Sequence, residues 1–181
     1  MSNFSETLRF FNLPYPEIIV GRYPKIGDED EGETKKFPID PNKLFIQFLP
    51  EFRSSYEYGD LLKGFEEESE DEVAITDLSF GLSAELSRFI YPRLLRNLED
   101  SQSEVDICKR FFLLMEKVFK HPDDLVNYAC GLEVFNTFDD SSDKFWKYIK
   151  ENLLPVSLNY FLAQEPMINE YNYFLKLKDI N

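Results

Sequence analysis

The sequence predicts a mainly α-helical fold, a multi-helix bundle or a short stack of helix pairs, with an irregular or short-strand segment at its N-terminus. Apolar residues make up 43% of the 181 residues and aromatic residues 16%, which is enough for a packed core. From about residue 83 onward, apolar residues recur at helical spacing. Five prolines interrupt the chain before residue 42, at positions 14, 16, 24, 38 and 41. We therefore expect an N-terminal arm over residues 1–41, packed on a helical domain over residues 42–181.

Short elements are expected in the first half of the chain. β-Branched residues gather at 17–23, which favours a short strand. Residues 44–49 are expected to form a helix or a strand. A second short helix is expected over 52–63, with Gly64 as its C-terminal stop. The acidic residues at 66–72 then lie in a loop.

The clearest helix is expected over residues 102–120, where Ser101 and Glu104 fit a capping box. Its apolar residues fill an arc of roughly 160°, wide enough to contact more than one neighbouring element. We therefore expect this helix at the centre of the core. Leu113 projects from the middle of its charged side, as either a single exposed leucine or a partner contact. The charged side holds Asp106, Lys109, Arg110, Glu116, Lys117 and Lys120.

Further helices are expected on both sides of this one. Pro92 interrupts the helical spacing of residues 82–98, which predicts one kinked helix or two short ones. Acidic caps or a first-turn proline predict the starts of the later helices, at Asp123 or Asp124, at the turn 139–143 and at Pro155. A final helix is expected over residues 167–178. Short connections between consecutive helices favour a bundle.

The net charge of −14 excludes several classes of partner. Acidic residues number 34 against 20 basic ones, and residues 1–80 alone carry 18 acidic and 8 basic side chains. Such a surface repels nucleic-acid phosphates and anionic membranes. No stretch has the ~18 to 20 apolar residues of a membrane span. We therefore expect neither a nucleic acid nor a membrane as partner.

The cysteines and the N-terminus favour the cytoplasm. Cys108 and Cys130 lie outside any CxxC motif and are interpreted as buried, reduced residues. The first residues lack a basic stretch followed by an apolar one, so no secretory signal is expected.

The residues that could carry chemistry are few. The seven glycines form neither GxGxxG nor GxxxxGK[ST]. His121 is the single histidine and is interpreted as a helix C-terminal residue, so a multi-histidine metal site is excluded. Cys108 lies about 20 Å from it along a straight helix, and an apolar setting would raise the pKa of Cys130. We expect no catalytic residue, metal or cofactor. A carboxylate-based enzyme is the least favoured alternative, since no motif selects a pair of carboxylates.

The acidic runs are the features that favour recognition of a basic protein. Opposite charge speeds encounter and sets orientation, while aromatic anchors supply affinity. Trp146 lies beside acids at one helix start, as an anchor or as a core residue, and the runs are either contacts or solubilising loops. The candidate contacts are Asp28, Glu29, Asp30, Glu31, Glu33, Glu66, Glu67, Glu68, Glu70, Asp71, Glu72, Leu113, Asp139, Asp140, Asp143 and Trp146.

Three segments carry a resemblance to a known kind of protein: 109–118, 123–135 and 153–157. They resemble small acidic helical bacterial immunity proteins, which pair with polymorphic toxins. The resemblance implies a non-catalytic protein that neutralises a cognate toxin by binding it. The alternatives are a nucleic-acid mimic that occupies a DNA-binding protein and an acidic structural or housekeeping protein. The oligomeric state is left open.

Overall fold

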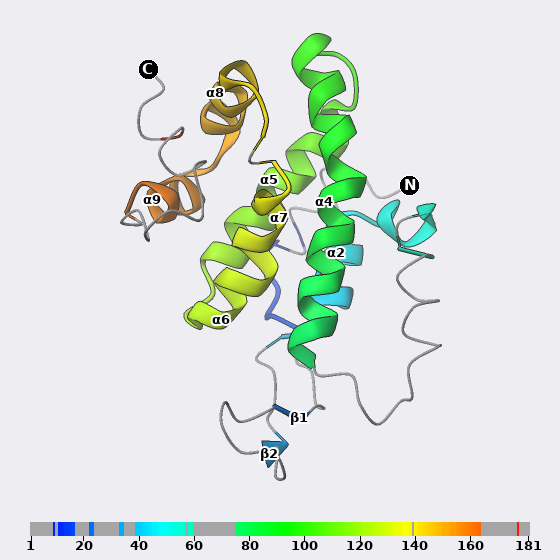
Figure 1. Ribbon diagram of the computed structural model, residues 1–181, viewed down its shortest axis with the longest axis vertical. Coiled ribbons are helices and arrows are strands. Elements are labelled where there is room, and N and C mark those ends of the chain that lie inside the picture. Colours follow the sequence, from blue (N-terminus) through cyan, green and yellow to red (C-terminus); the bar gives the residue numbers. More distant parts are fainter. Residues whose placement is uncertain are drawn as a thin grey trace.

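The fold is a helical bundle, as the sequence predicts (Figure 1). A computed structural model describes residues 9, 11–16, 22–23, 33–34, 39–56, 58–59, 75–138, 140–163 and 177, with the backbone alone for 22–23, 33–34 and 75–79. Its helices are α2 (Pro41–Phe48), η1 (Phe52–Ser54), α4 (Ile75–Glu99), α5 (Val105–Phe119), α6 (Asp124–Asn127), η2 (Tyr128–Leu132), α7 (Glu133–Asn136), α8 (Asp143–Asn152) and α9 (Pro155–Ala163). Among these helices, none combines the length and the apolar character that a membrane span requires.

Helix α5 lies at the centre of the core, as predicted. It contacts α2, α4, α6, η2 and α9. Its apolar side chains join one cluster of buried residues that extends from Ile39 to Leu177. Two acid–base pairs four residues apart also lie on this helix, with 2.8 Å between Arg110 and Asp106 and 3.7 Å between Lys120 and Glu116.

The predicted capping box of α5 is wrong. The helix begins at Val105, and Glu104 before it has a left-handed backbone with φ 55° and makes no capping hydrogen bond. The Glu104 carboxylate instead accepts from Arg96 of α4 at 2.9 Å. Asp100 accepts from the Gln102 N–H at 3.0 Å. Residues 100–104 therefore form the tight turn between α4 and α5. Glu104, which the capping box requires, bonds to Arg96 and does not cap α5.

The charged side of α5 is partly buried. Arg110, Glu116 and Lys117 are all less than a tenth exposed, whereas Asp106, Lys109 and Lys120 are exposed. Arg110 makes a two-pronged ion pair with Glu51, at 2.8 and 2.9 Å, and donates to the Phe48 carbonyl. Elements distant in the chain therefore cover part of this side of the helix and pair its buried charges.

Helix α4 is one continuous helix of 25 residues with Pro92 inside it. The Arg93 guanidinium donates to the Phe89 carbonyl oxygen at 2.5 Å and lies 3.8 Å from the centroid of the Phe89 ring. Pro92 has no backbone N–H to donate in this turn of the helix, and the Arg93 side chain adds a hydrogen bond to the same turn. Of the two expected arrangements, the single helix is the observed one.

Two short strands lie at the lower end of Figure 1. Strand β1 (Arg22–Tyr23) pairs antiparallel with β2 (Glu33–Thr34), with Arg22 opposite Thr34 and Tyr23 opposite Glu33. The predicted strand is confirmed at Arg22 and Tyr23, and residues 17–21 lie outside the described part. Strand β1 contacts α4.

The helix predicted over 52–63 is confirmed in part, since Tyr56, Tyr58 and Gly59 are helical. Phe52–Ser54 is a single 3-10 turn, because Ser55 takes an extended backbone that ends it. The Ser55 hydroxyl then accepts from the Tyr58 N–H at 3.2 Å. Residues 57 and 60–63 lie outside the described part of the chain.

The later helices begin where local signals place them. Asp123 caps α6 by accepting from the Leu125 N–H, Ser142 caps α8 by accepting from the Phe145 N–H, and Pro155 is the first residue of α9. Helices α6, η2 and α7 follow one another directly, and η2 has the wider π-helical turn. Of the helix expected over 167–178, the structure describes only Leu177, which is buried.

Candidate functional site

The chain's excess negative charge is concentrated in two segments. We call residues 24–33 and 57–74 the acidic segments; together they carry 13 acidic and 2 basic side chains, a net −11 of the total −14. Residues 75–163, by contrast, hold 14 acidic and 10 basic side chains. Many of these basic groups are paired, such as Arg96 with Glu104 and Arg88 with Glu85. The helical body is therefore close to neutral.

The first acidic segment and the C-terminal end of the second join the body at the same end. The second segment begins at another place, beside Tyr58, which packs against Phe52 next to Phe89 in the middle of α4. The first connects β1 to β2, and β1 contacts α4. The second leads directly into α4, whose first residue is Ile75. In Figure 1 the start of α4 and the strand pair lie together at the lower end of the molecule. We call this end, where β1 meets the start of α4, the acidic end.

The acidic end is defined by described residues alone. They are the strand pair, which includes Glu33, and Ile75, which follows Glu72 by three residues in the sequence. Residues 28–31 and 66–72 themselves lie outside the described part, as does the Glu33 side chain.

Two of the predicted partner contacts, Trp146 and Leu113, are buried and do not lie on the surface, so the prediction is wrong for both. Trp146 is fully buried, and its indole packs against Phe138 and Phe145 with ring centroids 6.4 and 6.0 Å away. It belongs to the apolar face of α8, so the core interpretation holds. Leu113 is only 8% exposed. It lies on α5 between Arg110 and Lys117, the residues that Glu51 and the N-terminal arm cover.

The remaining predicted contacts lie near the start of α8. Asp140 and Asp143 are exposed, and Asp143 stands in the first turn of that helix, where a carboxylate suits the helix dipole. Asp139 lies outside the described residues. Without an exposed tryptophan beside them, these aspartates are helix-start residues on the surface, and their role in binding stays a prediction.

The nucleophilic side chains are held in unreactive forms. Burial raises the pKa of the Cys108 thiol to about 11, and burial likewise raises the pKa of Cys130, which is fully enclosed. The reactive thiolate is thus scarce at neutral pH. Burial lowers the pKa of His121, whose Nδ1 accepts the Asp123 N–H at 3.1 Å. Within the described residues, no group of three or more His, Cys, Asp and Glu side chains is placed to hold a metal ion.

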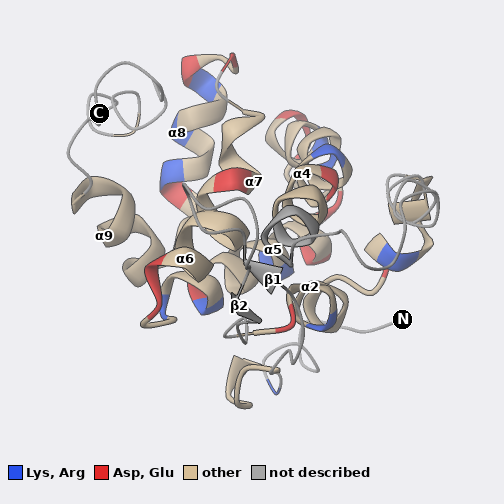
Figure 2. Cartoon of the chain, turned by 60° about the horizontal axis from the view of Figure 1, so that its bottom comes forward, with Lys and Arg blue, Asp and Glu red and all other residues tan. Residues whose placement is uncertain are grey.

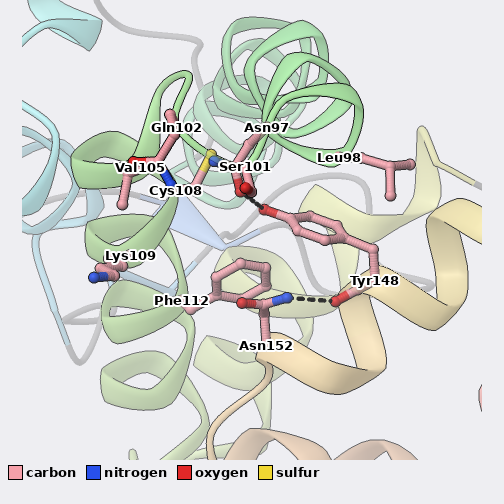
Figure 3. A pocket seen from close by; sticks show the side chains of 10 residues that line it. All are labelled: Asn97, Leu98, Ser101, Gln102, Val105, Cys108, Lys109, Phe112, Tyr148 and Asn152. Carbon is pink, nitrogen blue, oxygen red and sulfur yellow. Dashed lines mark hydrogen bonds between the residues drawn. The ribbon is translucent and has the colours of Figure 1, made fainter.

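One feature that sequence reasoning missed is a pocket of about 530 Å³ (Figure 3). It opens where the end of α4, the following turn and the start of α5 meet α8. Its aromatic lining comes from Phe112 and Tyr148, and Cys108 also borders it. Gln102 of the turn and Tyr148 of α8 lie 46 positions apart in the sequence, so no local pattern marks this pocket. The only trace of the pocket in the sequence is that the polar residues Asn97, Gln102 and Asn152, which border it, interrupt or follow helical segments.

Comparisons with protein-family models, with curated proteins and with solved structures found no match. The acidic end and the pocket are therefore the two features of the molecule from which a function is inferred.

Proposed function

We propose that this chain is a non-catalytic binding protein whose two acidic segments together engage a basic face of another protein. Within that class, we propose a bacterial immunity protein that acts in the cytoplasm and neutralises a cognate toxin domain. The single observation that supports this is that the first segment and the C-terminal end of the second join a nearly neutral body at the same end, while the two segments carry a net −11 between them. The resemblance of three helical segments to immunity proteins favours the more specific form.

The charge distribution suits recognition better than uniform solubility. A charge spread evenly over the surface keeps a protein soluble, whereas charge gathered at one end creates a directed field. A directed field raises the association rate with a cation-rich face and orients it. Figure 2 shows basic and acidic residues interspersed on the described helices, in agreement with the near-neutral body.

The test compares three variants with the unaltered chain. The first replaces the acids of 28–33 by their amides, and the second replaces those of 66–72. The matched control neutralises three exposed acids of the body that are not candidate contacts: Glu99, Asp124 and Glu151. Each tagged protein captures partners from a lysate of the cells that produce it, and mass spectrometry identifies them.

We expect a protein of basic isoelectric point to be retained by the unaltered chain and by the control. Either segment variant loses most of it, because each removes about half of the field at the acidic end. The association rate of the captured pair should fall steeply between low and high salt. Equal retention by all variants refutes recognition through the acidic segments. Capture of a DNA-binding protein that DNA displaces supports the nucleic-acid mimic instead, and relief of toxicity on co-expression supports immunity.

A further inference from the structure

The pocket between the α4–α5 turn and α8 is separate from the acidic end. Its α4 residue Asn97 follows Ile75 by 22 residues, which is about 33 Å along a helix. At about 530 Å³ it falls within the usual size of small-molecule sites. We propose that this pocket binds an uncharged planar heteroaromatic molecule, a free nucleobase or nucleoside, whose ring packs on Tyr148 and whose polar edge meets side-chain amides.

A fixed aromatic surface supplies the first requirement for such a ligand. The Tyr148 and Phe112 rings pack edge to face, with centroids 6.1 Å apart and planes at 65°. The Tyr148 hydroxyl donates to the Asn97 side-chain oxygen at 2.7 Å, which ties the ring of α8 to the end of α4 (Figure 3). The Asn97 amide nitrogen in turn donates to the Ser103 carbonyl at 2.5 Å. Tyr148 is therefore held in place before a ligand arrives, which lowers the entropy cost of binding.

Side-chain amides supply the second requirement. Gln102 and Asn152 border the pocket and are both exposed. The Asn152 amide nitrogen donates to the Tyr148 carbonyl at 2.8 Å, so its orientation is set by the helix that carries the aromatic ring. A primary amide offers a donor and an acceptor side by side, the pattern that matches the edge of a base. Aromatic packing with amide contacts is how proteins recognise unpaired bases.

Charge selects the uncharged members of this class. Among the described residues that line the pocket, only Lys109 carries a formal charge. Glu99, Asp100 and Glu104 adjoin the lining residues in the chain and outnumber Lys109, which disfavours ligands with several phosphate groups. Leu98 and Val105 add aliphatic surface, which a neutral ring covers at no cost in desolvated charge.

The test is an NMR titration of the full chain with adenosine and with uridine, followed by calorimetry. We expect shifts in residues 97–112 and 148–152, including the side-chain amides of Gln102 and Asn152. Ribose tests the sugar alone and indole tests an apolar ring alone, and both should bind at least about tenfold more weakly. The variants Gln102→Leu and Asn152→Leu should each weaken nucleoside binding about tenfold, the loss of one hydrogen-bonding pair. Asn159→Leu on the exposed face of α9 is the matched control and should bind normally.

Four outcomes overturn the proposal. One is the lack of any shift with either nucleoside up to about 10 mM, at which a ligand with a Kd of about 1 mM would fill most sites. Another is a response outside the two stretches named above. The third is indole binding as tightly as adenosine. The fourth is unaltered binding by both leucine variants when circular dichroism shows them folded. The amide variants of the acidic segments should bind adenosine normally, so failure here is distinguishable from failure of toxin recognition.

Discussion

Tyr15 and Lys117 hold the N-terminal arm against the central helix. The Tyr15 hydroxyl donates to the Lys117 carbonyl at 2.7 Å, and the Lys117 ammonium lies 4.2 Å from the centroid of the Tyr15 ring. The same ammonium donates to the carbonyl oxygens of Phe11 and Leu13, at 3.0 and 2.6 Å. The arm thus supplies the partners that let α5 bury a lysine, and burial lowers the pKa of that lysine.

Replacement of this lysine should free the arm. Lys117→Met keeps the aliphatic length but removes two charge-assisted hydrogen bonds and the contact with the tyrosine ring, so we expect a loss of about 1–3 kcal/mol in the free energy of unfolding. Urea unfolding measures the loss, and hydrogen exchange of residues 11–16 locates it. Lys144→Met on the exposed face of α8 is the control. An equal effect of the two substitutions would contradict the role of the buried lysine.

Glu116 is predicted to fix the start of α9. Its buried carboxylate accepts from the N–H groups of Val156 and Ser157, at 3.1 and 2.8 Å, and from the Ser157 hydroxyl at 2.9 Å. Glu116→Gln removes the charge and turns an amide N–H₂ toward donors, which should cost about 1–3 kcal/mol. Chemical denaturation of this variant and of Glu151→Gln, an exposed control, gives the comparison. Unchanged exchange protection at residues 155–158 would show that α9 does not depend on this carboxylate.

Gly131 tests packing against helix propensity. A Cβ placed there would lie 2.6 and 2.7 Å from two carbons of the buried Phe119 ring. Alanine favours a helix over glycine by about 1 kcal/mol, yet we expect Gly131→Ala to lose about 1–3 kcal/mol, because the Phe119 ring is buried against Tyr160 and Phe161. At Gly59 a Cβ would meet nothing within 4 Å, so Gly59→Ala is the control and should be neutral or stabilising. A thermal melt in which both variants behave alike would rule out the clash.

Alkaline pH should destabilise the fold through Cys108. Its pKa rises from an ordinary 9.0 to about 11 in the folded chain, so the unfolded chain loses this proton first. The stabilising contribution of the protonated Cys108 thiol to the free energy of unfolding is therefore complete below pH 9. It is lost as the pH rises from 9 to 11, by up to about 1.4 kcal/mol per pH unit. Cys108→Ala should flatten the unfolding free energy over this range relative to the unaltered chain. Parallel pH profiles of the two proteins would mean that the thiol titrates normally.

Acidic pH should act through His121. Burial lowers its pKa below 6.5, and the Tyr15 ring, Asp123 and Lys117 surround it. Because the unfolded chain takes up this proton first, the contribution to stability is complete above pH 6.5 and declines as the pH falls through the folded pKa. NMR gives the value directly, since the chain has one histidine. A folded-state pKa at or above that in urea would contradict the prediction.

Local patterns predicted much of the fold. Periodicity located α4 and α5, an aspartate and a proline marked the starts of α6 and α9, and the apolar settings of Cys108 and Cys130 anticipated their burial. These features depend on residues within a few turns of one another, which is why the sequence alone contains them. The concentration of acids in two segments is likewise a property of the sequence.

The tertiary structure alone decided which faces are covered and which segments meet. The side of α5 that carries Leu113 and Lys117 has the pattern of a solvated face, yet an arm more than one hundred residues earlier satisfies its charge and excludes water. Contact between β1 and α4 brings the strands that flank the first acidic segment beside the helix into which the second one leads, and α8 closes a pocket on the α4–α5 turn. Periodicity shows which residues share a face, but burial depends on what packs against that face, and this is set by contacts between distant parts of the chain.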